Sequence, residues 1–342
     1  MLGAKNHLVA LLAVSFVLIA GGLGSIKAQN AIGVAQDAPL DYNGDHKTDF
    51  VVVRNTGGGP TGQLTWLIDS YKTAGTFGAL PWGIATDSRV AGDFDGDDKA
   101  DITVYRPGAE SFFYTLRTAD GTFLARQLGA TGDDPSVVGD YDGDNIDDFA
   151  VYRSGANAGD PSFWYWLGSA TVGGGLSSVH WGQNGDFVAP GDYDGDKKYD
   201  FCIQRNNGGG QARFWLLKSG GGIETLVWGT PTDVIVPGDY DGDGKTDFAV
   251  VRGSGGQLIW SVLGRNGDNI IHFGRQWGLS ATDLVAQGDY DGDGKTDLAV
   301  WRPVAAAGQT SFHISRSGSA GAVQSVQWGQ NGDYPVANFN RH

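Results

Sequence analysis

The chain has 342 residues, a formal net charge of −15 at pH 7 and one cysteine, Cys202. One cysteine cannot form an intrachain disulfide, and the sequence shows neither a basic patch for nucleic acid nor a glycine loop for nucleotide phosphates. Glycine and aromatic residues are abundant, whereas glutamate occurs only as Glu110 and Glu224. This composition favours strands and turns, so we expect an all-β fold.

Residues 1–28 resemble an export signal: Lys5 precedes an apolar run over 8–20, and small residues continue to Ala28. An uncleaved anchor is the alternative, because 8–26 is almost long enough to span a bilayer. We expect cleavage, which leaves residues 29–342 as a single domain that is secreted, displayed on the cell surface or periplasmic. The protein would contact a membrane only if the segment stays uncleaved.

An acidic loop recurs six times along the chain. The loops begin at Asp41, Asp93, Asp140, Asp192, Asp239 and Asp289, with spacings of 47 to 52 residues. Such a period is typical of a propeller or a solenoid. Each loop is followed by a short run that ends in arginine, and these runs cover 50–54, 102–106, 149–153, 201–205, 248–252 and 298–302. Because they are mostly apolar without alternation, we expect strands covered on both faces.

Two further strands follow in each repeat. The second, rich in aromatic residues, covers 64–68, 112–116, 163–167, 214–217, 259–263 and 312–315. The third ends in Trp-Gly at Trp82, Trp181, Trp228, Trp277 and Trp328, with Leu128 as the exception. A short segment such as 234–239 then runs into the next loop, which makes four strands per unit. Four-stranded units of this length predict blades arranged radially in a β-propeller.

The chain end decides the number of blades. Residues 328–340 begin like another repeat, but Asn338 and Asn340 replace its first acidic residues and the sequence stops at His342. We therefore predict six blades, with 335–339 as a closing strand in the blade that contains 41–54. A frayed tail is the alternative, and a seven-bladed ring is disfavoured because 29–40 and the tail have too few strand-forming residues.

Carboxylates at loop positions 1, 3, 5 and 9 and a backbone carbonyl at position 7 point several hard oxygens at one centre. This donor set suits Ca²⁺ better than Mg²⁺, which sheds water reluctantly. Two carboxylates about 4 Å apart repel by roughly 4 kcal/mol at an effective dielectric near 20, so the loops favour a bound cation. We predict up to six Ca²⁺ sites, ligated by Asp41, Asn43, Asp45, Lys47, Asp49, Asp93, Asp95, Asp97, Lys99, Asp101, Asp140, Asp142, Asp144, Ile146, Asp148, Asp192, Asp194, Asp196, Lys198, Asp200, Asp239, Asp241, Asp243, Lys245, Asp247, Asp289, Asp291, Asp293, Lys295 and Asp297.

Other readings of the loops fit less well. An EF-hand needs glutamate at position 12 and flanking helices, whereas position 12 of the fifth loop is Val250, inside a predicted strand. A purely structural acidic turn without metal remains an alternative. The first loop carries Asn43 for aspartate and Leu40 for the preceding glycine, so it is expected to be the weakest site.

The repeats resemble the FG-GAP or VCBS repeats of integrin-alpha-like β-propellers over essentially the whole mature chain. Trp-Gly stands where that family often has Phe-Gly, and segments such as 236–239 (VPGD) stand near its Gly-Ala-Pro element. The resemblance implies a β-propeller, and it also raises carbohydrate binding, since propeller lectins with similar repeats bind glycans between blades.

Three residue types invite functional hypotheses. The repeated arginines (Arg54, Arg106, Arg153, Arg205, Arg252 and Arg302) would form an anion-binding ring or, as we expect, structural ion pairs. The tryptophans would stack on sugars or, as we expect, pack in the core. Cys202 takes a strand position held by alanine in sister repeats, so a small buried hydrophobe is expected. None of the six histidines lies in a catalytic or metal-binding motif.

The sequence thus predicts an exported, calcium-binding β-propeller that is not an enzyme and serves as a binding or adhesion module for a protein or glycan outside the cell. A multivalent lectin is the first alternative. A secreted polysaccharide-active enzyme is the second, because similar propellers occur in lyases. Nucleotide and nucleic-acid partners are not expected.

Overall fold

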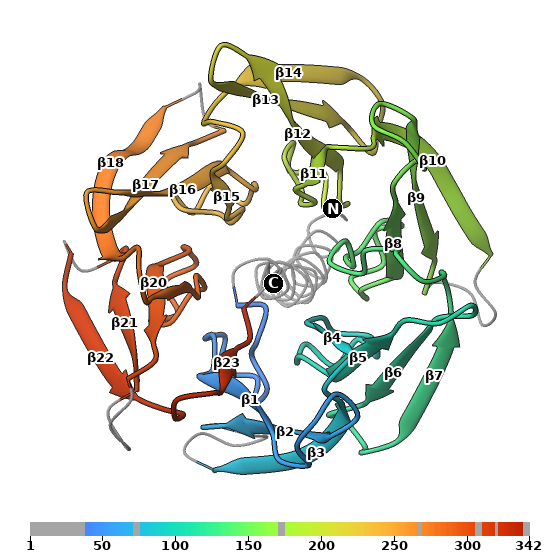
Figure 1. Cartoon of the computed structure of the whole chain (residues 1–342), viewed down its shortest axis with the longest axis vertical. Coiled ribbons are helices and arrows are strands. Elements are labelled where there is room, and N and C mark those ends of the chain that lie inside the picture. The colour runs from blue at the N-terminus through green and yellow to red at the C-terminus, as the bar shows by residue number, and fades with distance from the viewer. Residues whose placement is uncertain are drawn as a thin grey trace, which may run out of the picture.

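The computed structural model describes residues 38–70, 76–169, 175–265, 269–304, 310–318 and 321–337. These residues form strands β1 to β23 and contain no helix, so the described part of the chain also has no helix that could span a membrane. Six antiparallel sheets surround a central axis, as Figure 1 shows. This is the predicted all-β propeller with six blades. The predicted export signal lies outside the described residues.

The blades are numbered in chain order, and their strands are given from the axis outward. Blade 1 contains β23 (Tyr334–Pro335), β1 (Val51–Asn55), β2 (Gln63–Ile68) and β3 (Gly78–Ile84). Blade 2 contains β4 (Ser88–Val90), β5 (Ile102–Arg106), β6 (Phe112–Leu116) and β7 (Phe123–Gln127). Blade 3 contains β8 (Phe149–Arg153), β9 (Pro161–Leu167) and β10 (Leu176–Gln183).

Blade 4 contains β11 (Phe187–Val188), β12 (Phe201–Gly208), β13 (Gln211–Leu217) and β14 (Ile223–Val227). Blade 5 contains β15 (Val234–Ile235), β16 (Phe248–Ser254), β17 (Gln257–Leu263) and β18 (Ile270–Leu279). Blade 6 contains β19 (Leu284–Val285), β20 (Leu298–Arg302), β21 (Ser311–Ser315) and β22 (Val323–Gln327).

Burial explains why the apolar runs form the second strand of each blade. Residues Val51–Val53 of β1 are fully buried, and β5, β8 and β20 each have four consecutive buried residues, as expected for strands covered on both faces. The next strand outward alternates, as in β2, where Leu64, Trp66 and Ile68 are buried. Cys202, in β12, is fully buried as predicted.

The chain end closes the ring in blade 1. Tyr334 pairs with Val53 and Pro335 with Val52, and the N–H of Val336 donates to the carbonyl of Val51 at 3.1 Å. Figure 1 shows β23, in red, beside β1, in blue, so the first and the last described strands share one sheet. The predicted closing strand, 335–339, is confirmed at Pro335, although the strand begins one residue earlier, at Tyr334, and residues 338–339 lie outside the described part.

Blade 3 departs from the predicted four strands, because its innermost segment forms only one bridge, between Asp134 and Tyr152. In blades 4, 5, 6 and 1 the residue two positions further donates its N–H to the second strand, as Ala189 does to Cys202. In blade 3 that residue is Ser136, whose N–H donates to the Asp134 side chain instead, at 3.1 Å. The aspartate side chain therefore competes with the ladder and ends it.

Tryptophans of the Trp-Gly pairs join neighbouring blades. The indole N–H of Trp82 in blade 1 donates to the carbonyl of Tyr114 in blade 2, at 3.0 Å. The equivalent bonds are Trp181 to Trp215, Trp228 to Ser261, Trp277 to His313 and, at the ring closure, Trp328 to Leu67. Leu128 stands at this position between blades 2 and 3 and has no indole to donate. The structural role expected for these tryptophans is thus observed.

Candidate metal centres

The acidic loops are numbered with their blades: loop 1 (41–49), loop 2 (93–101), loop 3 (140–148), loop 4 (192–200), loop 5 (239–247) and loop 6 (289–297). Each precedes the second strand of its blade, so the rigid strand fixes position 9. Position 4 is always glycine with φ of 76° to 83°, a left-handed conformation that other residues rarely adopt and that turns the loop back on itself.

The carboxylate at position 1 organises each loop from within. In loop 5, Asp239 accepts N–H bonds from Gly242 at 2.6 Å and from Gly244 at 2.7 Å. The carboxylate at position 9 holds the loop to the rest of the blade: Asp247 accepts from the N–H of Tyr240 at 2.8 Å and from the N–H of Arg265, in the turn after β17, at 3.1 Å. Backbone donors thus fix the carboxylates at both ends of the loop.

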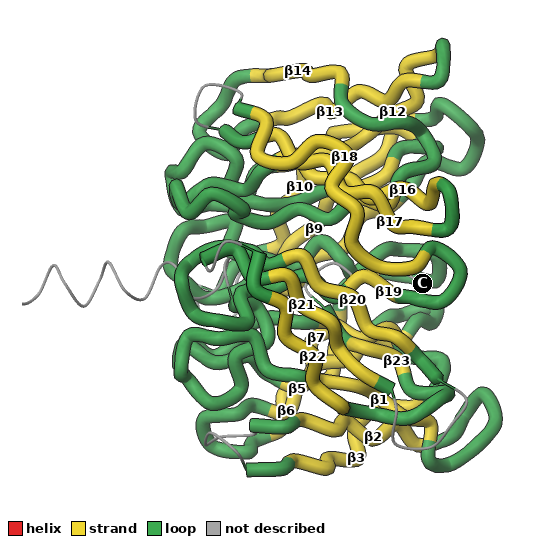
Figure 2. Tube along the Cα trace, turned by 90° about the vertical axis from the view of Figure 1, so that its left-hand side faces the viewer, coloured by secondary structure: helices red, strands yellow, loops and turns green. Residues whose placement is uncertain are grey.

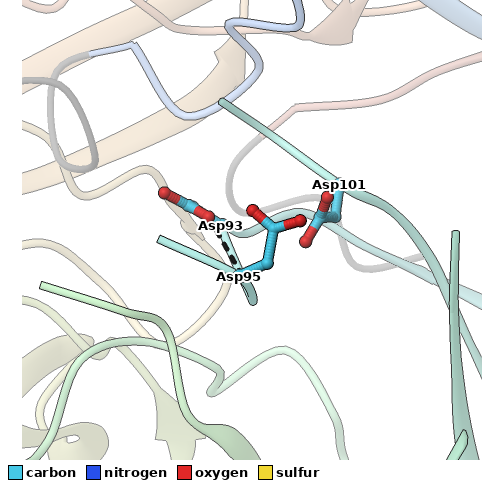
Figure 3. A group of neighbouring side chains, drawn as sticks. All are labelled: Asp93, Asp95 and Asp101. Atoms are coloured by element: carbon cyan, nitrogen blue, oxygen red, sulfur yellow. Dashed lines mark hydrogen bonds between the residues drawn. The ribbon is translucent and has the colours of Figure 1, made fainter. Parts of the chain in front are cut away.

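Carboxylates from different loop positions converge in five of the loops. One oxygen from each member of a group lies within 4.8 Å of the others, and Figure 3 shows the group of loop 2. The groups are Asp93, Asp95 and Asp101; Asp140, Asp142 and Asp148; Asp192, Asp194 and Asp200; Asp239, Asp241 and Asp243; and Asp289, Asp291 and Asp297. Positions 1 and 3 therefore meet in each of these loops, usually with position 9.

Position 5 is not a member of the converging group in loops 2, 3, 4 and 6. Its carboxylate instead accepts the N–H of position 7, as Asp196 does from Lys198 at 3.0 Å. The same bond occurs for Lys47, Lys99, Ile146, Lys245 and Lys295. In loops 3, 4 and 6 a serine hydroxyl also donates to position 5, as Ser219 does to Asp196 at 2.7 Å.

Loop 1 differs because position 3 is an amide. The Asn43 side-chain N–H donates to Asp49 at 3.0 Å, so the amide already satisfies the oxygen that a cation would attract. Asp41 keeps the usual bonds from Gly44 and His46, and Asp45 holds the N–H of Lys47. That loop 1 is the weakest of the six sites stays a prediction.

Burial makes the negative charge of the ion-free loops unfavourable. Desolvation raises the pKa of Asp49 and Asp247 to about 8, although backbone N–H bonds lower it in part. It raises the pKa of Asp101, Asp148 and Asp200 to about 7. Neighbouring carboxylates add to these shifts. A divalent cation would relieve both the desolvation and the repulsion, because it is attracted to the ionised form.

Unsatisfied oxygens test whether the loops fit a cation. Within the described part of the chain, Oδ1 of Asp194 and Oδ1 of Asp291 are buried and accept no hydrogen bond. Both belong to position 3 and to the converging groups. A buried oxygen without a donor is costly, and a hard cation coordinated by several carboxylates satisfies it. The donor set therefore fits Ca²⁺, which positions 1 and 3 would hold together with position 9 in loops 2, 3, 4 and 6 and with position 5 in loop 5.

Consecutive loops are joined directly into a circle. The N–H of position 8 donates to the carbonyl of position 1 in the preceding loop, at 2.6 to 2.7 Å in all six cases. Thr296 donates to Asp239 in this way, and Thr48 donates to Asp289, which joins loop 1 to loop 6. Position 1 of each loop is thus hydrogen-bonded to the residue two or three positions before the second strand of the next blade.

Side chains at position 8 explain the glycine that precedes most loops. A Cβ on Gly288 would lie 2.6 Å from Oγ1 of Thr48, and one on Gly139 would overlap the ring of Tyr199. Leu40 precedes loop 1, and position 8 of loop 2 is Ala100; both are buried in one core cluster. The larger residue before loop 1 is therefore matched by a smaller one in loop 2.

The repeated arginines have partners that sequence reasoning did not identify. Arg106 forms a bidentate pair with buried Asp87, which also accepts the N–H of Ile84 from the end of blade 1. The remaining pairs are Arg54 with Asp333, Arg153 with Asp133, Arg205 with Asp186, Arg252 with Asp233 and Arg302 with Asp283. The expected structural role is observed. The aspartate partners could have been recognised in the sequence, because an aspartate follows each Trp-Gly tryptophan, or Leu128, by five or six residues.

The fold and the loops define the class: a six-bladed β-propeller with an acidic loop in every blade. Residues 239–300, from the start of loop 5 into β20, match the family described as FG-GAP-like repeat. Together with the six-fold recurrence of the same loop and strand, this match supports an FG-GAP-type β-propeller.

The sequence matches no curated protein. Among solved structures, the uncomplexed acylaminoacyl peptidase of Pyrococcus horikoshii aligns with 11% identity and a TM-score of 0.41, over 82% of this chain and 44% of that chain. The alignment therefore spans less than half of the peptidase.

Proposed function

We propose that this protein is an exported, calcium-stabilised propeller that serves as a non-catalytic binding or adhesion module outside the cell. An FG-GAP propeller fold is consistent with a binding module. The observation that carries the calcium claim is the convergence of carboxylates in loops 2 to 6, within 4.8 Å in each group. The export signal predicted for residues 1–28 supports the location, and a calcium-rich exterior suits sites of modest affinity.

Calcium has a clear structural task in this fold. With one buried cysteine, the chain has no disulfide to hold its loops. Each loop instead contains several carboxylates close to the hydrogen bond that joins it to the next loop. Cations at these sites would remove the repulsion at every blade junction and so stabilise the closed ring. Positions 1 and 3 would hold the ion together with position 9 or, in loop 5, position 5, and its charge would favour their ionised form.

Thermal unfolding of the mature chain tests this proposal. The midpoint is expected to rise by several degrees from ion-free buffer to millimolar Ca²⁺, and to fall again with chelator, because an ion that binds only the folded state stabilises it by mass action. Mg²⁺ at the same concentration should have a smaller effect. An unchanged midpoint with and without Ca²⁺ would overturn the calcium claim.

A lectin is the second candidate, favoured by aromatic pairs on the outer rim. Phe123, Phe273 and Phe77 are 60%, 77% and 59% exposed, and each packs on a Trp-Gly tryptophan of a neighbouring blade. Such exposed rings could stack on sugars at the junctions between blades. Binding of one glycan class on an array in saturating Ca²⁺, with loss in Phe273→Ala, would establish it. An array without hits would leave the protein-binding role.

A further inference from the structure

A cavity of about 750 Å³ lies at one mouth of the central channel. Its wall includes the residues with which the innermost strands begin, among them Ser88, Phe187 and Val234. The acidic loops follow the other ends of these strands, so the cavity lies on the opposite side of the ring from the candidate metal centres. Figure 2 shows the loops that cap both sides of the ring. The volume falls within the range of small-molecule sites, roughly 300–1,000 Å³.

One charged residue interrupts an otherwise apolar position in this wall. The second paired residue of the innermost strand is Val188 in β11, Ile235 in β15 and Val285 in β19, and all three line the cavity. In β4 the corresponding residue is Arg89, which pairs with Val104. Packing alone would favour an aliphatic side chain here as well. The packing of the ring therefore does not explain why this position carries an arginine.

Arg89 has no carboxylate partner within the described residues. Its guanidinium lies 5.4 Å from the centre of the Tyr334 ring, and no other described residue forms an ion pair or hydrogen bond with it. This separates it from the six repeated arginines, which are all paired. Burial lowers the pKa of Arg89 below its usual value, which reflects the desolvation of an uncompensated charge. The side chain also borders a smaller cavity deeper in the channel, so it lies at the floor of the mouth.

The acidic residues around the mouth leave this positive charge available. Asp87, Asp133 and Asp233 line the cavity, but each is held in a bidentate pair with an arginine. Asp134 accepts bonds from the N–H and hydroxyl of Ser136 and contributes one further negative charge. That charge would repel a polyanion more strongly than a ligand with a single anionic group.

We propose that the channel mouth binds a small ligand with one carboxylate, anchored by Arg89. Arginine presents a planar fork that matches a carboxylate in two hydrogen bonds. The exposed ring of Phe187 and the side chain of Val234, 48% and 37% exposed, offer apolar surface for the ligand body. A uronate-containing saccharide and the C-terminus of a short peptide both supply this chemistry. The inference deepens the proposed binding role and rests on it, but it does not depend on calcium.

Titration calorimetry of the calcium-loaded protein tests the site. The probes are a disaccharide with one glucuronate and an acetylated tripeptide with a free C-terminus, each compared with its methyl ester or amide. At least one acid is expected to bind and its blocked form to bind at least about 10-fold more weakly, and the arm that binds identifies the source. Absence of binding by both acids up to about 10 mM would overturn the proposal.

Two variants locate the binding. Arg89→Val introduces the kind of residue that sister blades carry, so it should fold, and it is expected to weaken the acid at least about 10-fold. Arg126→Val removes an exposed arginine from outer strand β7 and should leave binding unchanged. Unchanged affinity in Arg89→Val would overturn the site while leaving the binding role intact. If Arg89→Val does not fold, protection of Arg89 from phenylglyoxal in the wild type, by the acid but not its blocked form, decides the question.

Discussion

The backbone N–H of Thr48 donates to the carbonyl of Asp289 at 2.6 Å, and this bond closes the circle of acidic loops. The strands close at the same junction through β23 and β1, and the indole of Trp328 adds a bond to Leu67. Three kinds of contact thus join the first blade to the last. Because the same loop and indole contacts recur elsewhere in the ring, closure uses the ordinary blade interface and needs no special device.

Gly288→Ala tests the packing between consecutive loops. The new methyl group would lie 2.6 Å from Oγ1 of Thr48, so we expect a loss of about 1–3 kcal/mol in the free energy of unfolding. Thr48→Ala alone should change little, because its buried hydroxyl has no hydrogen-bond partner in the described structure. The double variant should recover most of the loss, as Ala100 accommodates Leu40. Denaturant unfolding of all four proteins gives the coupling energy, and strict additivity would contradict the packing argument.

The fold could be predicted from the sequence because the local structure of each loop and strand requires particular residues, and these recur in every repeat. Glycine at position 4 and aspartate at position 1 are required by the loop itself, and the apolar run of β1 is required by burial. Asp87 was missed because its partner, Arg106, is brought close only by strand pairing. The match between Leu40 and Ala100 was missed for the same reason, since it depends on contact between blades. That position 5 is outside the converging group in loops 2, 3, 4 and 6 depends on side-chain directions that spacing does not reveal.

Trp328→Phe should weaken the closing interface. The ring keeps most of its apolar contacts, but the indole N–H is lost and the carbonyl of Leu67 loses its donor. We expect a loss of about 1–2 kcal/mol in the free energy of unfolding. Hydrogen exchange should quicken first in β1 and β23. Trp228→Phe is the matched control, since it removes the bond to Ser261 between blades 4 and 5 and should loosen that junction instead. Identical exchange patterns in both variants would refute the local role.

Asn43→Asp should strengthen the weakest candidate metal centre. The change gives loop 1 the carboxylate that the other loops carry at position 3 and removes the amide bond to Asp49. Calcium titration of the ion-free variant is expected to show one more tight site than the wild type. Without calcium the variant should be less stable, because the new charge faces Asp49 and Asp41. The reverse change, Asp194→Asn in loop 4, should remove one site. An unchanged stoichiometry in both variants would rule out the loops as the binding sites.

Stability in the absence of calcium should fall as the pH rises from about 5 to 8. Burial raises the pKa of Asp49 and Asp247 to about 8, whereas an aspartate in the unfolded chain titrates near 3.9. The folded state therefore holds more protons than the unfolded state across this window, and deprotonation favours unfolding. Calcium binds the deprotonated carboxylates, so its stabilising effect should grow over the same range. Thermal midpoints of ion-free protein at several pH values, repeated in millimolar Ca²⁺, measure both trends.

Asp247→Asn should flatten the ion-free profile, because the substituted amide does not titrate. An ion-free midpoint that rises from pH 5 to 8 would show that these carboxylates are already compensated by the fold.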